Sequence, residues 1–340
     1  MTNTAELHDY PSPEALLSAD QALRGRVIDT PLLSVPSLAE ITGASSVRVK
    51  LEIFQQTGSF KFRGALWRCL QLNHDEREAG VVAYSSGNFA QGLAAAAQSL
   101  GIPCTIVMPI DAPETKRTKT ERYGAKVVLT EHGDHPREKI ASERAVKIAR
   151  EQKMTLLHPF DDPYIVAGHA SLAYEVGRYL RATGESLPDD VLCCVGGGGL
   201  IAGLALGFSD MGDSTFVIPV EPIGFDGMGQ SLQAGERLTV AGDKATICDA
   251  LQATAPGIIP FAAMRQCKYK QGISVSDGEV RTAMKVAADL LRIVLEPSGA
   301  APLAALLGAS NRFAGRNVLL IASGGNIDPS YFARYLGEAA

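Results

Sequence analysis

The chain has 340 residues, of which 46% are hydrophobic and 20% are charged, and its formal net charge is −5. These values are typical of an ordinary globular protein, and the length exceeds the usual size of one hydrophobic core, so we expect two domains. The negative charge, without any Lys/Arg block, argues against a nucleic-acid partner, and no apolar run reaches the roughly 18 residues that a membrane span needs.

Predicted strands and helices alternate along most of the chain. Residues 1–20 are polar and contain prolines, which favours an arm over the surface with a short helix near residues 13–22. Residues 47–54 alternate between apolar and polar side chains, the period of a half-buried strand. The later strands are short, apolar and separated by helical patterns, which is typical of parallel sheets with helices on both faces. The other predicted strands span residues 81–85, 104–108, 126–129, 155–157, 191–195, 215–220 and 318–322, and the main predicted helices span residues 89–100, 113–123, 136–152, 165–180, 200–208, 277–294 and 299–308.

The middle of the chain has an organisation of its own. The strands and helices predicted for residues 80–157 make a self-contained β/α set. Such a set predicts a small domain, residues 80–157, inserted into a larger domain made of residues 1–75 and 158–340.

The cysteines and the N-terminal residues bear on the cellular compartment. The six cysteines include no C-x-x-C pair and no spacing typical of a disulfide framework. No apolar N-terminal segment resembles a signal peptide. We therefore expect a reducing, cytoplasmic location, and we interpret the adjacent Cys193 and Cys194 as packing residues of a buried strand.

Lys61 lies between Phe60 and Phe62, directly after a Thr-Gly-Ser turn at residues 57–59. Here the strand pattern of residues 47–54 gives way to helical spacing, so Lys61 falls in the first turn of a helix, whose positive end disfavours a cation. Burial would lower the pKa of the amine further and leave it neutral, able to form a Schiff base. The alternative is a surface lysine whose stem lies across two aromatic rings.

Four consecutive glycines, residues 196–199, separate a buried-strand pattern from an apolar helix that begins at Leu200. Successive backbone N–H groups at a helix N-terminus suit a phosphate dianion. The alternative is a loose strand-to-helix turn, although one or two glycines would be enough for that. The run is not a dinucleotide-binding fingerprint, because that spacing would need a glycine at Leu200, and no Walker lysine is present.

Polar side chains also gather at the ends of two other predicted strands. Ser85, Ser86, Gly87 and Asn88 precede a helix, where hydroxyls and amides suit a substrate carboxylate, although serine and asparagine could also be N-caps. Ser323 follows the last strand, at the carboxyl edge where doubly wound sheets place ligands. The absence of a G-x-S-x-G elbow argues against a serine hydrolase. The six histidines show no metal-ligand spacing.

Together and in this order, these motifs resemble the fold-type II pyridoxal-phosphate enzymes, in the threonine/serine dehydratase and serine racemase branch. The similarity runs from Asp-Thr-Pro-Leu at residues 29–32 to Ser-Gly-Gly-Asn at residues 323–326. It implies an α/β fold of two parallel-sheet domains with helices on both faces. Pyridoxal 5'-phosphate would lie in the cleft between the two domains.

The resemblance also implies a role for each matching residue. Lys61 would form a Schiff base with the cofactor, and Ser86 would be a second proton carrier on the opposite face. Ser323, in place of an aspartate, would face the pyridine nitrogen and leave it unprotonated, which suits β-elimination. The other cofactor contacts would come from Phe60 on the ring, Asn88 at the ring hydroxyl, Glu296 near the ring, and Gly196, Gly197, Gly198, Gly199 and Leu200 around the phosphate. The substrate would contact Ser85, Ser86, Gly87, Asn88 and Phe89.

The implied reaction is that of an ammonia-lyase (dehydratase), which converts a β-hydroxy amino acid of the threonine or serine type to a 2-keto acid and ammonia. One alternative is an amino-acid racemase that uses Lys61 and Ser86 as opposed bases. Another is a non-catalytic binding protein for the cofactor or an amino acid, which the complete Lys61 motif disfavours. The partner would be a small amino acid, and the base rate for assembly favours a homodimer.

The chain departs from the family pattern at positions that concern the substrate and the metal. Phe89 stands where these dehydratases usually have histidine, which suits a bulkier β-hydroxy amino acid. Arg137 is near a position that some relatives use for a second carboxylate, which would favour 3-hydroxyaspartate; the alternative is a solvated arginine in a helix. Glu221 matches the glutamate of the family's divalent-cation site, but Gly227 replaces the second ligand and Asp226 is one residue early.

Overall fold

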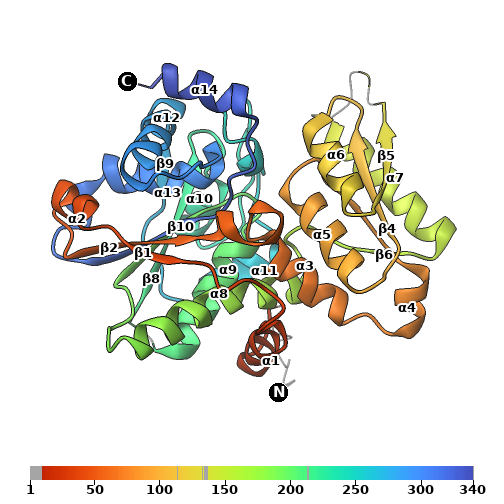
Figure 1. The fold of residues 1–340 in the computed structure, drawn as a ribbon, viewed down its shortest axis with the longest axis horizontal. Helices are drawn as coiled ribbons and strands as arrows, with labels where there is room; N and C mark the ends of the chain where they lie inside the picture. Colours follow the sequence, from red (N-terminus) through yellow and green to blue (C-terminus); the bar gives the residue numbers. More distant parts are fainter. Residues whose placement is uncertain (1–9, 113, 132, 134–136, 213, 340) are drawn as a thin grey trace.

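The computed structural model describes residues 10–112, 114–131, 133, 137–212 and 214–339. In this part of the chain the strands form two sheets that helices surround (Figure 1). The strands are β1 (Leu32–Ser34), β2 (Ser46–Leu51), β3 (Val81–Tyr84), β4 (Cys104–Pro109), β5 (Lys126–Thr130), β6 (Thr155–Leu156), β7 (Asp190–Cys194), β8 (Phe216–Pro222), β9 (Ile273–Val275) and β10 (Asn317–Ala322). The helices are α1 (Pro13–Leu23), α2 (Pro36–Thr42), α3 (Lys61–Leu70), α4 (His74–Ala79), α5 (Asn88–Ser99), α6 (Glu114–Arg122), α7 (Arg137–Gln152), α8 (Pro163–Ala182), α9 (Gly199–Met211), α10 (Gly227–Ala234), α11 (Ile258–Gln266), α12 (Asp277–Val286), α13 (Pro297–Gly308) and α14 (Pro329–Gly337).

The smaller sheet has the strand order β5-β4-β3-β6, and all of its pairs are parallel. Alternate residues of β3 point to opposite faces, as the strand period requires. Val81 packs in a cluster with Phe89 of α5, and Val82 packs in a separate cluster with Ile148 of α7. Helices therefore cover both faces of this sheet, as the sequence predicts.

The larger sheet has the order β1-β2-β10-β7-β8-β9. Its pairs are parallel except at one edge, where β1 runs antiparallel to β2 and Leu33 lies opposite Val49. The prediction of two parallel sheets is confirmed, with β1 as an unpredicted antiparallel edge strand. A three-residue strand is too short to show any periodicity in the sequence.

The two sheets follow the predicted division of the chain. Every strand of the smaller sheet lies within residues 80–157, and every strand of the larger sheet lies outside that range. In Figure 1 the smaller sheet lies at one side of the molecule, with α3 between it and the larger sheet. The assignment of residues 1–75 and 158–340 to one domain and of residues 80–157 to another stays a prediction.

The short helix predicted near residues 13–22 is confirmed as α1, whereas the length of the helix expected over residues 277–294 and the surface placement of the N-terminal segment were wrong. The helix expected over residues 277–294 ends earlier, because α12 passes into a π-helical turn at residues 287–291 and Arg292 has a left-handed backbone with φ 58°. The N-terminal arm is also more than a surface segment. Helix α1 buries Leu16 and Leu23 in the core, and Asp20 forms an ion pair with Arg178 of α8. Helices α2, α4, α10, α11 and α14 and the short strand β9 were not predicted.

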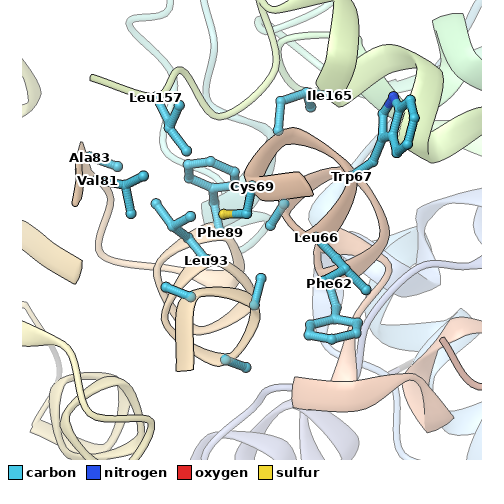
Figure 2. Packing of buried hydrophobic residues seen from close by; sticks show 14 of the residues in the cluster. Phe62, Leu66, Trp67, Cys69, Val81, Ala83, Phe89, Leu93, Leu157 and Ile165 are labelled. Atoms are coloured by element: carbon cyan, nitrogen blue, oxygen red, sulfur yellow. The ribbon is translucent and has the colours of Figure 1, made fainter. Parts of the chain in front are cut away.

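Helix α3, which begins at Lys61, is held between the two sheets by close packing. Figure 2 shows Phe62 and Leu66 of α3 in one cluster with Phe89 and Leu93 of α5. A Cβ atom at Gly92 of α5 would lie 3.1 Å from the backbone of Lys61, so glycine permits this close approach. The start of α3 is therefore fixed by the hydrophobic core.

None of the helices in the described part of the chain is both long and apolar enough to cross a membrane.

Candidate active site

Lys61 is the first residue of α3, which confirms the prediction that it lies in the first turn of a helix. Its Nζ donates a hydrogen bond of 2.9 Å to the carbonyl oxygen of Pro159 and lies 5.0 Å from the ring centre of Phe60 and 5.7 Å from that of Phe89. Burial lowers the pKa of Lys61 to about 8, because the charged amine loses its hydration. About a tenth of the amine is therefore neutral at pH 7, far more than for an ordinary lysine.

Backbone hydrogen bonds bring the end of β10 to the start of α3. Phe60 N donates to Ser323 O at 3.0 Å, and Gly325 N donates to Gly58 O at 3.0 Å. These residues lie far apart in the sequence but form one short antiparallel bridge between Ser59 and Gly324. The Ser-Gly-Gly-Asn motif of residues 323–326 is therefore adjacent in the structure to the residues that precede Lys61.

The glycine run forms the turn between β7 and α9. Gly198 has φ +95°, in the left-handed region that favours glycine, and no described side chain caps the helix that follows. A Cβ atom at Gly197 would lie 2.2 Å from the ring of Phe160, and one at Gly196 would lie 2.7 Å from the carbonyl oxygen of Ala250. The turn thus needs glycines, and its role in binding a phosphate at the N-terminus of α9 stays a prediction.

The segment from Ser85 to Asn88 joins β3 to α5. Ser85 Oγ accepts a hydrogen bond from Gly87 N at 3.3 Å, and no side chain among the described residues caps α5. Asn88 is buried, and its Nδ2 donates to Glu296 Oε1 at 2.6 Å while its Oδ1 accepts from Asn326 Nδ2 at 2.8 Å. The side chain of Asn88 therefore bonds to Glu296 and Asn326 and does not cap the helix. Its Nδ2 carries a second hydrogen that a ligand can accept.

Glu296 precedes α13 and is buried beside Asn88. Burial raises the pKa of Glu296 to about 8, because the carboxylate loses its hydration. A Cβ atom at Gly324 would lie 2.3 Å from Glu296 Oε1, so any side chain there would displace the Glu296 carboxylate. At neutral pH Glu296 is therefore mostly a neutral acid that accepts a hydrogen bond from Asn88.

A cleft of about 560 Å³ opens beside these residues, between α5 and α6 on one side and α13 and α14 on the other. Gln91, Glu296 and Asn326 form part of its wall. Lys116 of α6 forms an ion pair across it with Asp249. The cleft thus lies between two helices from the part of the chain that forms the smaller sheet and two helices from the part that forms the larger sheet.

The remaining predicted residues differ in how deeply the structure buries them. Phe89 is buried in the core, next to Cys69 and Leu157 in Figure 2, with one side of its ring toward Lys61. Leu200 packs its side chain into the core of the larger sheet, so only its amide is available to a ligand. Ser86 is partly exposed in the loop before α5. Arg137 begins α7, but its side chain lies outside the described residues, so its predicted role stays a prediction.

Glu221, the predicted metal ligand, lies at the end of β8. Its carboxylate accepts hydrogen bonds from Met228 N at 2.9 Å and from Gly229 N at 2.8 Å, at the start of α10. Burial raises its pKa to about 8. Among the described residues no group of three His, Cys, Asp or Glu side chains could hold a metal ion. The weak prediction that Glu221 binds a cation stays untested.

Sequence reasoning missed two residues of the site. Asn326 belongs to the recognised Ser-Gly-Gly-Asn motif, but its bonds to Asn88 Oδ1 and to Thr57 O, at 2.7 Å, depend on contacts far apart in the chain. Cys194 was interpreted as a packing residue, yet its Sγ lies 3.2 Å from Ser323 Oγ. The only signal for it in the sequence is its position two residues before the glycine run, which the interpretation as a packing residue did not use.

Comparison with known proteins gives consistent matches along almost the whole chain. Residues 23–324 match the model of the family described as "Pyridoxal-phosphate dependent enzyme". The chain is 35% identical to a serine racemase of Schizosaccharomyces pombe, over 96% of this chain and 98% of that protein. It is 37% identical to an L-threo-3-hydroxyaspartate ammonia-lyase of Pseudomonas sp, over 94% and 97% of the two chains. The solved structure of a T.th. threonine deaminase covers 94% of this chain and 99% of its own, at 36% identity and a TM-score of 0.86.

Proposed function

The chain belongs to the pyridoxal-phosphate-dependent enzymes, and from this premise we propose that it is an ammonia-lyase that converts a β-hydroxy amino acid of the threonine or serine type to a 2-keto acid and ammonia. The observation that carries the proposal is the backbone hydrogen bond from Phe60 N to Ser323 O, which brings Ser323 next to the start of α3, where the pKa of Lys61 is lowered to about 8. The hydroxyl of Ser323, in place of the carboxylate of an aspartate, suits β-elimination. Ammonia-lyases and deaminases among the similar proteins support the same reaction.

The residues of the site fit pyridoxal 5'-phosphate. Lys61 supplies an amine for the aldehyde, and the glycine turn at residues 196–199, which is packed too closely for any Cβ atom, supplies backbone N–H groups for the phosphate together with the amide of Leu200. Asn88 has a second N–H for the ring hydroxyl, and Ser323 has a hydroxyl for the ring nitrogen. Phe60 lies beside the lysine, in position for the ring. When bound, the cofactor supplies an electron sink for the bond that breaks at the substrate's α-carbon.

The protein's own groups transfer the proton, bind the substrate carboxylate and orient Asn88. Lys61, once its amine is free, takes the proton from the α-carbon, and its lowered pKa makes it a base near neutral pH. The N-terminus of α5 and the hydroxyls of Ser85 and Ser86 hold the substrate carboxylate. Glu296, neutral at pH 7, keeps Asn88 oriented without adding a negative charge beside the ring.

The pKa of Lys61 predicts how cofactor uptake depends on pH. Only the neutral amine attacks an aldehyde, so the uptake rate of the cofactor-free protein should rise about tenfold per pH unit below pH 8 and level off above it. An ordinary lysine, with a pKa of 10.5, would keep the rate rising well beyond that point. The growth of visible absorbance after mixing measures the rate. A rate still rising steeply well above pH 8 would contradict the lowered pKa.

Gly196→Ala should weaken cofactor binding by more than about tenfold. The new Cβ would lie 2.7 Å from a backbone carbonyl, which a side-chain rotation cannot relieve, so the phosphate turn must shift. Equilibrium dialysis with pyridoxal phosphate measures the loss. Gly278→Ala is the matched control, because its Cβ meets only Ser276 Oγ at 3.9 Å on α12, and it should leave binding unchanged. Equal affinity in the two variants would contradict the phosphate assignment.

Release of a keto acid by the purified holoenzyme is the direct test of the proposal. Both enantiomers of serine, threonine, 3-hydroxyaspartate and phenylserine should be offered, and keto acid and ammonia measured together. We expect both products, in equal amounts, from at least one of these amino acids. Phe89 favours a bulky side chain, whereas Arg137 and the similarity to an L-threo-3-hydroxyaspartate ammonia-lyase favour a second carboxylate. A protein that binds the cofactor but releases no keto acid would exclude the lyase.

A racemase is the second candidate, because Ser86 lies in the loop before α5 and a serine racemase is among the similar proteins. The Ser86→Ala variant distinguishes the racemase from the lyase, because it removes the second proton carrier. This variant should lose interconversion of serine enantiomers by at least about a hundredfold but keep much of the elimination from one enantiomer. Chiral chromatography and keto-acid release, measured on one sample, give the two rates. Equal loss of both would show that Ser86 serves elimination too.

We further propose a cytoplasmic homodimer. None of the six cysteines, all of which the structure describes, forms a disulfide bond, as in proteins of a reducing compartment, and closed homodimers are the commonest oligomers. Sedimentation of the holoenzyme tests the assembly.

A divalent cation at Glu221 is a weaker proposal, and dialysis against a chelator followed by thermal unfolding tests it.

A further inference from the structure

Cys194 and Ser323 form a buried polar contact at the carboxyl edge of the larger sheet. Strands β7 and β10 are parallel neighbours in which Leu192 lies opposite Leu320, so each strand reaches its last residue at the same level. The Sγ of Cys194 lies 3.2 Å from the Oγ of Ser323. The two residues are only 6% and 3% exposed, so water does not compete for this contact.

The single proton of the serine hydroxyl decides the direction of this hydrogen bond. By its geometry the contact permits either atom to be the donor. On the proposed function, Ser323 faces a pyridine nitrogen that carries no proton and can only accept. The hydroxyl must then donate to the nitrogen, and its oxygen is left as an acceptor. The donor to that oxygen is the S–H of Cys194.

We propose that Cys194 is a positioning residue whose thiol donates to Ser323 Oγ and so holds the hydroxyl proton toward the cofactor's ring nitrogen. This inference rests on the proposed function of Ser323. Hydrogen bonds in a chain polarise one another in a buried, low-dielectric site, so the thiol also strengthens the bond from the hydroxyl to the nitrogen. Without it, the hydroxyl hydrogen is free to rotate away.

The surroundings of Cys194 support a role beyond packing. Its Sγ contacts Ser323, whose carbonyl oxygen accepts a hydrogen bond of 3.0 Å from Phe60 N, the residue before Lys61. Cys193 has the same chemistry but points to the opposite face of the sheet, into a different hydrophobic cluster. It makes its hydrogen bond to the carbonyl oxygen of Cys194 and not to Ser323.

A double-mutant cycle tests the proposal. The dissociation constant of pyridoxal phosphate, from equilibrium dialysis, and the absorption spectrum of the bound cofactor are measured for the wild type, Cys194→Ala, Ser323→Ala and the double variant. Cys194→Ala should raise the dissociation constant about three- to tenfold, the effect of one hydrogen bond. In the Ser323→Ala background the same change should have no effect. Cys194→Ser, which restores a donor, should recover the wild-type spectrum.

Cys193→Ala is the matched control, because it creates a similar cavity one residue away. It should leave the dissociation constant and the spectrum unchanged, and circular dichroism checks that each variant is folded. An equal loss from Cys194→Ala in both backgrounds, or an equal loss from Cys193→Ala, would overturn the proposal. The proposed function is judged separately: a wild type that binds the cofactor and releases keto acid upholds it even if the cycle is additive.

Discussion

Lys61→Ala should lower keto-acid release by at least about a thousandfold, because one side chain provides both the covalent attachment of the cofactor and the base for the α-proton. The variant should also lose the visible absorbance band that depends on a lysine Schiff base. The amine is placed for this work by its bond to the Pro159 carbonyl and by the packing of α3. Steady-state rates of keto-acid release and absorption spectra, both with saturating cofactor, measure the two effects.

Lys139→Ala is the control for this variant, because Lys139 lies exposed on α7 in a long, weak contact of 4.0 Å with Glu143. It should keep the full rate and the spectrum. Ammonia release by Lys61→Ala at more than a tenth of the wild-type rate would remove Lys61 from the chemistry and with it the assignment of the reaction.

Arg63→Ala should lower the free energy of unfolding by about 3–5 kcal/mol, the usual effect of breaking a buried ion pair. Arg63 is fully buried two residues after Lys61 and holds Glu52 through two hydrogen bonds of 2.7 Å. It also pairs with Glu175 of α8 at 2.8 Å, and Glu175 in turn binds Lys50. Removing the guanidinium leaves two buried carboxylates with one cation between them.

The midpoint of urea unfolding for the cofactor-free protein measures this change. Lys147→Ala serves as the comparison, because its pair with Glu151 is exposed on α7 at 3.7 Å and should contribute no more than about 0.5 kcal/mol. A loss of less than about 1 kcal/mol from Arg63→Ala would mean that the carboxylates find other partners. Because the ion pairs hold the start of α3, we also expect weaker cofactor binding in this variant.

Local patterns were enough to predict most of the strands and the local structure around several residues of the candidate site. The alternation over residues 47–54 indicated β2, and the change to helical spacing at Lys61 indicated the start of α3. The glycine run before Leu200 indicated the turn before α9. Each of these features depends on residues within a few positions of one another, where side-chain period and backbone freedom act directly.

The sequence by itself thus determined the α/β class, the parallel sheets, the lysine at a helix start and the glycine turn at another. Only the tertiary structure decided which polar groups meet. The bond between Asn88 and Glu296 joins residues 208 positions apart, and Cys194 reaches Ser323 only because β7 and β10 are neighbours. Strand order and helix packing bring these groups together, and neither depends on a local pattern. The raised pKa of Glu296 follows from the same cause, because burial is a property of the assembled fold.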